Sequence, residues 1–117
     1  MQLKNKIVNK DEYFNFIIED AGHYFKDQII SLFILFRKLK PEGVFIVEEL
    51  DFPEIRNDMN EDKEKPTLKE ILDLIKENKE FFSKYINDDD KKYFLDNFKE
   101  INIFKGKFNE IAFIKKK

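Results

Sequence analysis

The sequence predicts an α/β protein whose sheet begins with a parallel pair of strands, and two observations lead to this fold class. First, short apolar runs at residues 14–19 and 44–48 flank a longer segment of helical periodicity at residues 25–39. A strand–helix–strand unit forms a right-handed crossover, so its strands run parallel. Because both strands are continuous apolar runs, we expect helices on both faces, as in a doubly wound sheet. Second, apolar runs at residues 98–104 and 108–114 predict a C-terminal antiparallel hairpin.

The first strand and the first helix follow from the spacing of apolar residues. The run FNFIIE is short and bounded by charge, which indicates a buried strand. Within residues 25–39, the residues that share one helix face are Phe25, Ile29, Leu32, Phe33 and Phe36. Ile30, Ile34 and Leu35 widen that face, so we expect the helix to be covered on more than one side. Pro41 cannot continue a helix and therefore ends it.

The second half of the chain begins with a polar loop and continues with two helices. Residues 51–66 lack apolar periodicity, and a loop of this length is typical of a functional lid or a disordered segment. The sequence TLKE at residues 67–70 is a capping box, with Thr67 as the N-cap of the next helix. The expected buried face of that helix is Leu68, Ile71, Leu72, Ile75, Phe82 and Tyr85. Residues 87–97 predict a short charged helix or turn, and KGK at residues 105–107 predicts the hairpin turn.

Composition narrows the class of protein. The chain has 117 residues, which fits a single domain over residues 1–117. Its 22 basic and 24 acidic residues give a net charge of −2, which offers no reason to expect nucleic acid or a membrane as a partner. The three C-terminal lysines are expected to form a solvated tail. Cysteine is absent, which excludes disulfides and thiolate metal sites. No apolar run reaches the ~20 residues of a membrane span, so we expect a soluble cytoplasmic protein.

Polar side chains gather where the two parallel strands end. The residues at these two ends are Glu19, Asp20, His23, Glu48, Glu49 and Asp51. In open α/β sheets, ligands bind beyond the carboxyl ends of the strands, so these side chains are expected to share one rim. Carboxylates placed together repel one another and need a cation or shifted pKa values. Oxygen ligands without cysteine suit Mg²⁺, and His23 beside the cation could act as a general base.

A simpler interpretation explains the same residues without a site. Strand ends carry polar residues whenever they reach solvent, and a single histidine is structural more often than catalytic. The matched positions on two strands strengthen the case for a site beyond that of a lone motif, but they do not exclude the simpler interpretation.

The stretch FNFIIEDAGHYFKDQIISLFILFRKLKPEGVFIVEEL, residues 14–50, resembles part of class I S-adenosylmethionine-dependent methyltransferases of the macrocin and mycinamicin sugar O-methyltransferase type. The pattern in that family is an apolar strand, Asp-Asp-Gly-Ser-His, a helix, Leu-x-Pro-Gly-Gly and an apolar strand that ends in Glu-Asp. The later helix and hairpin also suit the end of that fold. The resemblance therefore implies the C-terminal half of a Rossmann-like methyltransferase sheet.

The resemblance also implies roles for the rim residues. Asp20 matches a metal ligand, and Glu48 and Glu49 match the acid pair that completes the magnesium site. His23 matches the base that takes a proton from the hydroxyl acceptor, such as a sugar. The positions expected to bind S-adenosylmethionine are Glu19 and Ala21.

The sequence departs from the family pattern in two respects. The motif reads Glu-Asp-Ala-Gly-His at residues 19–23, and Glu49 stands in place of an aspartate. None of the three glycines, Gly22, Gly43 and Gly106, forms the GxG loop of the cofactor pocket. We therefore expect the N-terminal half of the fold to be missing. The strand at residues 14–19 would then have an unpaired edge, which predicts a homo-oligomer or pairing with a separate N-terminal half.

Two other functions are consistent with the sequence. The chain could be a non-catalytic methyltransferase remnant that acts as an interaction module, which the missing glycine loop favours. It could also be a metal-dependent enzyme of another class on a small α/β scaffold, since a fold does not determine a reaction.

Overall fold

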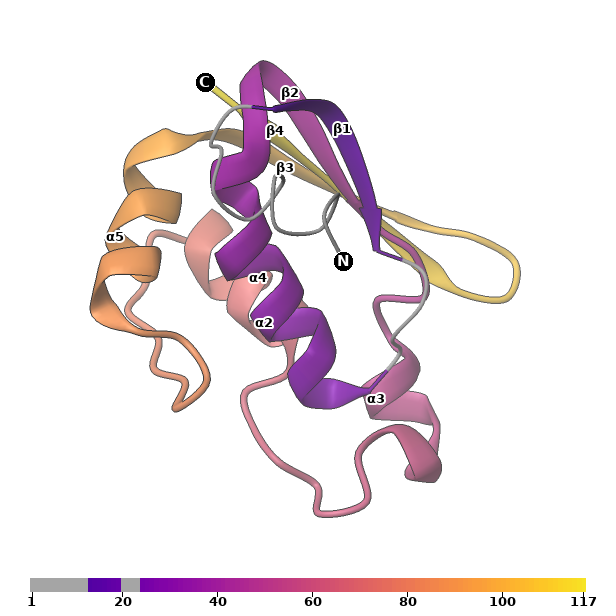
Figure 1. Cartoon of the computed structure of the whole chain (residues 1–117). Helices are drawn as coiled ribbons and strands as arrows, with labels where there is room; N and C mark the ends of the chain where they lie inside the picture. Colours follow the sequence, from indigo (N-terminus) through magenta and orange to yellow (C-terminus); the bar gives the residue numbers. More distant parts are fainter. Residues whose placement is uncertain (1–12, 20–23) are drawn as a thin grey trace, which may run out of the picture.

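The computed structural model describes residues 13–19 and 24–117, and its centre is a mixed four-stranded sheet (Figure 1). The strands are β1 (Phe14–Glu19), β2 (Leu39–Val47), β3 (Phe98–Lys105) and β4 (Glu110–Lys116). They lie in the order β1-β2-β4-β3. Strands β1 and β2 are parallel, whereas β4 is antiparallel to both β2 and β3. The α/β class, the parallel pair and the C-terminal hairpin are thus confirmed.

Six helical segments in the described part of the chain connect these strands. They are α2 (Phe25–Leu35), the 3-10 helix η1 (Phe36–Lys38), α3 (Phe52–Ile55), the 3-10 helix η2 (Asn57–Met59), α4 (Leu68–Lys76) and α5 (Asp88–Asn97). In Figure 1, α2 crosses in front of α4, and α5 lies beside them at the same end of the sheet. No helix among the described residues is long and apolar enough to cross a membrane.

The predicted face of α2 forms the centre of the core. All five of its members are buried: Phe25, Ile29, Leu32, Phe33 and Phe36. Two of the rings meet Phe94 of α5, with ring centroids 4.8 Å from Phe33 and 4.7 Å from Phe36. Of the residues expected to widen this face, Leu35 packs against the core and Ile34 is 48% exposed, so the additional cover of the helix is partial among the described residues.

Only one face of the sheet is covered by the described residues. The side chains of the covered face include Phe45, Val47, Ile101, Ala112 and Ile114, all of them buried. On the opposite face lie Phe16, Ile18, Phe104 and Phe113, which are 61%, 48%, 59% and 36% exposed. We call these four residues the open face. The doubly wound arrangement with helices on both faces is therefore not present in the described part of the chain, and β1 is a half-exposed edge strand rather than a buried one.

The loop and the later helices differ from the prediction in detail. Residues 51–66 contain α3 and η2 rather than only irregular chain. The capping box is confirmed, because Thr67 and Glu70 exchange both of its hydrogen bonds. The helix ends at Lys76 instead of continuing to Tyr85, and Asn78 follows with a left-handed φ of 58°. As a result Phe82, expected in the buried face, is 78% exposed, and its neighbour Phe81 is buried.

The two middle strands differ from their predicted bounds: β2 is longer, and β4 is shifted by two residues toward the C-terminus. β2 begins at Leu39, five residues before the predicted start, and includes Pro41 and Gly43. β4 continues to Lys116, which is 2% exposed, so the expectation of a solvated lysine tail is wrong at this residue. The Lys116 ammonium donates to the backbone oxygen of Leu39 at 2.7 Å and contacts the Tyr93 hydroxyl. A buried ammonium is tolerated because these oxygens replace its hydration.

Candidate functional site

The carboxyl ends of β1 and β2 lie side by side and form one rim. Glu19 is the register partner of Val47 in the parallel pair. The backbone N–H of Glu48 donates to the backbone oxygen of Glu19 at 3.2 Å, which extends the ladder one residue beyond the strand. The acids that end the two strands are therefore neighbours, as the sequence predicted.

Part of the predicted site falls outside the described residues. Asp20, Ala21 and His23 belong to the connection from β1 to α2, which the structure does not describe. Their roles as metal ligand, cofactor contact and base remain predictions from the sequence. The structure does describe Glu19, Glu48 and Glu49, so their positions can be compared with the roles expected for them.

Glu19 is a buried carboxylate on the covered face of the sheet. Its side chain is 8% exposed, and its Oε1 atom has no access to solvent. Side chains of a strand alternate between the two faces, and the register partner Val47 is buried beneath the helices. Glu19 therefore points toward α2. A carboxylate in this position requires compensation by hydrogen bonds, a proton or a cation.

Glu49 lies in the turn that follows β2, and a side chain of α2 holds this turn. The Glu49 backbone has a left-handed φ of 56°, which is uncommon for a residue with a side chain. The Nε2 group of Gln28 donates to the Glu49 backbone oxygen at 3.0 Å. One carboxylate oxygen, Glu49 Oε2, has no access to solvent. The turn thus brings Glu49 to the N-terminal part of α2.

Gln28 is a buried polar residue beside the rim that sequence reasoning missed. It is fully buried in the first turns of α2, and its Oε1 atom has no hydrogen-bond partner among residues 13–19 and 24–117. A signal for it was present in the sequence. Gln28 is three residues after Phe25 and four before Leu32, so it occupies the face predicted to be apolar. A polar residue at such a position needs a partner, which marks it as a candidate site residue.

The other two acids after β2 are arranged differently. Glu48 follows Val47, so continued strand alternation directs it to the open face, away from Glu19. The Asp51 Oδ1 atom accepts a hydrogen bond from the backbone N–H of Glu110 at 3.1 Å. Asp51 therefore ties the end of β2 to the start of β4 and has a structural role.

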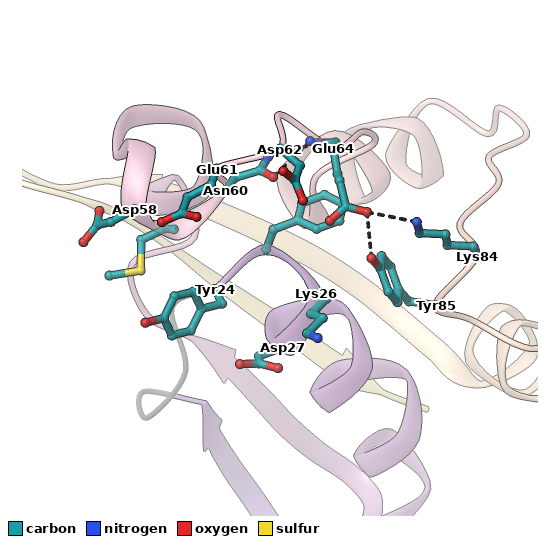
Figure 2. A pocket seen from close by; sticks show the side chains of 12 residues that line it. Tyr24, Lys26, Asp27, Asp58, Asn60, Glu61, Asp62, Glu64, Lys84 and Tyr85 are labelled. Atoms are coloured by element: carbon teal, nitrogen blue, oxygen red, sulfur yellow. Dashed lines mark hydrogen bonds and ion pairs between the residues drawn. The ribbon is translucent and has the colours of Figure 1, made fainter.

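A pocket of about 800 Å³ opens at the N-terminal turn of α2. Figure 2 shows Tyr24 and Asp27 on the α2 side, facing Asn60, Glu61 and Asp62 of the loop after η2. The pocket combines aromatic rings with many carboxylates, and it starts one helical turn from Gln28. It is thus a polar space next to the rim, large enough for a small organic molecule.

A three-residue contact closes one side of this pocket. Glu64 accepts hydrogen bonds from the Tyr85 hydroxyl at 2.6 Å and from the Lys84 ammonium at 3.2 Å (Figure 2). The hydrogen bond from Tyr85, reinforced by Lys84, lowers the pKa of Glu64 below its usual value. The same contacts with Glu64 raise the pKa values of Tyr85 and Lys84. These three residues therefore anchor the polar loop to the segment before α5.

The described residues supply some of the oxygen ligands that a hard divalent cation needs, but not a complete set. No group of three or more His, Asp or Glu side chains in the described part of the chain is close enough together to bind a metal. Glu19, Gln28 and Glu49 each have one side-chain oxygen without access to solvent. Oxygen atoms of carboxylates and amides are the ligands that Mg²⁺ and Ca²⁺ prefer. Asp20 would add a further carboxylate directly after Glu19.

In comparisons with known proteins, no protein-family model, no curated protein and no solved structure matches this chain.

Proposed function

We propose that this chain is the metal-binding, base-carrying half of a Mg²⁺-assisted, S-adenosylmethionine-dependent O-methyltransferase. The observation that carries the proposal is the hydrogen bond from the Glu48 N–H to the Glu19 oxygen, which joins the ends of two parallel strands. It brings together the acids of the two motifs that resemble the methyltransferase pattern. In this proposal the sheet is a partial Rossmann-like methyltransferase sheet.

The acids and the histidine at the ends of β1 and β2 have distinct roles in the proposed reaction. Asp20 and Glu49 would hold the cation, with Glu19 and Ala21 facing the cofactor, whereas Glu48, which strand alternation directs to the open face, lies away from this set. When bound, Mg²⁺ would act as a Lewis acid toward the hydroxyl oxygen of the acceptor. His23 would accept the hydroxyl proton on its imidazole while the oxygen takes the methyl group, because its ordinary pKa is near neutral.

The acceptor is proposed to be a small hydroxyl compound such as a sugar. The pocket beside α2 supports this class of acceptor, because its carboxylates can accept hydrogen bonds from several hydroxyl groups. The aromatic ring of Tyr24 can contact the apolar face of a sugar ring. Tyr24, which lines the pocket, directly follows His23 in the sequence.

The test is methyl transfer by a reconstituted enzyme. The chain is combined with a polypeptide that supplies the glycine-rich part of the cofactor pocket, together with Mg²⁺, labelled S-adenosylmethionine and a panel of sugars. His23→Ala should lower the transfer rate by about 10²–10⁴-fold, the usual contribution of a general base. Lys92→Ala on the exposed side of α5 is the control. Transfer that is unchanged by His23→Ala would contradict the assignment of the base.

A second candidate function is an interaction module without catalysis. The open face favours it, because Phe16, Ile18, Phe104 and Phe113 are exposed apolar side chains spread over three strands. Titration calorimetry with S-adenosylmethionine separates the two functions when the cofactor-binding polypeptide is present. A folded complex that binds no S-adenosylmethionine would favour the interaction module over the enzyme.

A further inference from the structure

We propose that two copies of this chain pair through the outer edge of β1, antiparallel and centred on Phe16, so that their two sheets join into one. The sequence left open whether this edge meets a second copy or another polypeptide, and the geometry of the edge favours the second copy. The pairing does not involve the proposed metal site or reaction, so the failure of one would not decide the other.

The first argument is the backbone of β1, which is hydrogen-bonded on one side only. β1 is the end strand in the sheet order and pairs with β2 among the described strands. On that inner side, the Glu19 backbone oxygen accepts from the Glu48 N–H at 3.2 Å. Hydrogen-bonding residues alternate along a parallel ladder, so every second residue counted back from Glu19 faces β2. The backbone N–H and C=O groups of Phe14, Phe16 and Ile18 therefore point outward.

The second argument is that this edge is complementary to itself. In an antiparallel pair, residues opposite each other exchange both backbone hydrogen bonds at every second position. With Phe16 opposite Phe16 of the second copy, Phe14 lies opposite Ile18, and every outward N–H and C=O group of these residues gains a partner. The same surface is used by both copies, so the contact closes as a two-fold dimer instead of continuing into a fibre.

The third argument is the set of side chains that this pairing brings together. Phe16 and Ile18 are 61% and 48% exposed on the open face. The pairing places one aromatic ring beside another at the centre and an aromatic ring beside a β-branched residue on either side. Cross-strand pairs of these two kinds stabilise antiparallel sheets. The dimer thus removes apolar surface from water in addition to satisfying the backbone.

The fourth argument is the contrast with the opposite edge of the sheet. β3 carries Lys99, Glu100 and Lys105, and charged side chains on an edge strand hinder its pairing with another chain. β1 has no charged residue from Phe14 to Ile18. Two copies of this edge can therefore meet without placing like charges opposite each other, which would be unfavourable. The sheet has one protected edge and one that is suited to a second copy.

The test uses single cysteines in the full chain, which has none of its own. Phe16→Cys places two thiols opposite each other at the Cα separation of about 5.5 Å of a hydrogen-bonded pair, which a disulfide can span. Phe113→Cys is the control, because Phe113 lies on the same open face but on β4, two strands from this edge. Each variant is mildly oxidised, and the disulfide-linked dimer is measured by non-reducing electrophoresis.

We expect most of the Phe16→Cys variant and little of the Phe113→Cys variant to become linked. Equal linking of the two variants, or more linking of Phe113→Cys, would overturn the proposal, because the open faces would then meet instead of the edges. An absence of linked dimer in both variants would overturn it as well.

Amide hydrogen exchange in the wild-type chain covers the case in which a cysteine variant does not fold. As the protein concentration rises, the outward N–H groups of Phe16 and Ile18 should exchange more slowly, because they become hydrogen-bonded in the dimer. The N–H of Ile17 faces β2 and should be protected at every concentration. Exchange at Phe16 and Ile18 that does not depend on concentration would contradict the pairing.

Discussion

At the scale of single residues, polar side chains in this protein are placed by hydrogen bonds to the backbone as much as by contacts with each other. Gln28 holds the turn at Glu49, and Asp51 holds the start of β4 through the Glu110 N–H. The sequence placed Asp51 in the same acidic group as Glu48 and Glu49. Only the structure distinguishes them, because sequence spacing does not reveal which carboxylate a distant backbone N–H will use.

The contact between Glu64 and Tyr85 leads to a prediction about pH. The pKa of Glu64 is lowered from 4.5, mainly by the Tyr85 hydroxyl. A lowered pKa in the folded state means that Glu64 contributes stability above pH 4.5, and this contribution is lost as the pH falls through the lowered value. Tyr85→Phe should therefore raise the pKa of Glu64 toward 4.5, as measured by NMR titration of its carboxyl carbon.

The same substitution should reduce stability at neutral pH and have a smaller effect at low pH, where Glu64 is protonated. The control is Tyr24→Phe, which alters the other labelled tyrosine of the pocket (Figure 2). A Glu64 pKa that is the same in wild type and Tyr85→Phe would contradict the role of the hydroxyl.

At the scale of helices and strands, the elements with strong local signals were predicted correctly. The capping box fixed the start of α4, and the apolar spacing of α2 identified its buried face. The end of α4 was missed, because the apolar residues after Lys76 continue the helical spacing by chance. The left-handed Asn78 and the packing of Phe81 end the helix there, and this depends on tertiary contacts.

Thr67 gives a prediction for α4. Its Oγ1 accepts from the Glu70 N–H at 3.2 Å and donates to Glu54 Oε2 at 2.7 Å. Thr67→Ala removes both contacts and should lower the free energy of unfolding by about 1–2 kcal/mol, as is typical of N-cap loss. Chemical denaturation measures this change. Thr67→Ser keeps the hydroxyl and should recover most of the loss, and an equal loss in both variants would contradict the capping role.

Gly43 gives a prediction for the pair β1 and β2. A Cβ atom at this position would lie 2.8 Å from the Lys40 backbone oxygen and 2.9 Å from that of Asn15. Backbone atoms in paired strands cannot move aside easily, so Gly43→Ala should destabilise the fold by about 1–3 kcal/mol. Gly106→Ala in the hairpin turn is the comparison and should cost less stability, because its nearest atom, the Asn109 backbone oxygen, is 3.1 Å away. Equal stability of Gly43→Ala and wild type would contradict the close approach.

At the scale of the whole molecule, the part of the sheet that the structure describes has an open face and an open edge together at β1. The sequence predicted the open edge through the resemblance to half of a methyltransferase fold. It did not predict the open face, because the exposed Phe16 and Ile18 alternate with other apolar residues in one continuous run. An apolar run looks the same whether one or both faces are covered.

The open face predicts self-association of the isolated chain. Exposed apolar residues that are contiguous across strands are typical of interaction surfaces, and an unpaired strand edge adds backbone hydrogen bonds. Sedimentation velocity should show association that increases with concentration, and Phe16→Lys should weaken it. Phe82→Lys is the control, because Phe82 is more exposed but lies outside the sheet. A monomer at all concentrations would contradict this prediction.

If the ends of β1 and β2 form a site for a divalent cation, Mg²⁺ titrated into the chain should bind at one site in wild type. Binding should be lost in Asp20→Asn and in Glu49→Gln, with the fold retained by circular dichroism. The absence of Mg²⁺ binding in wild type, or equal binding in all three proteins, would contradict this site.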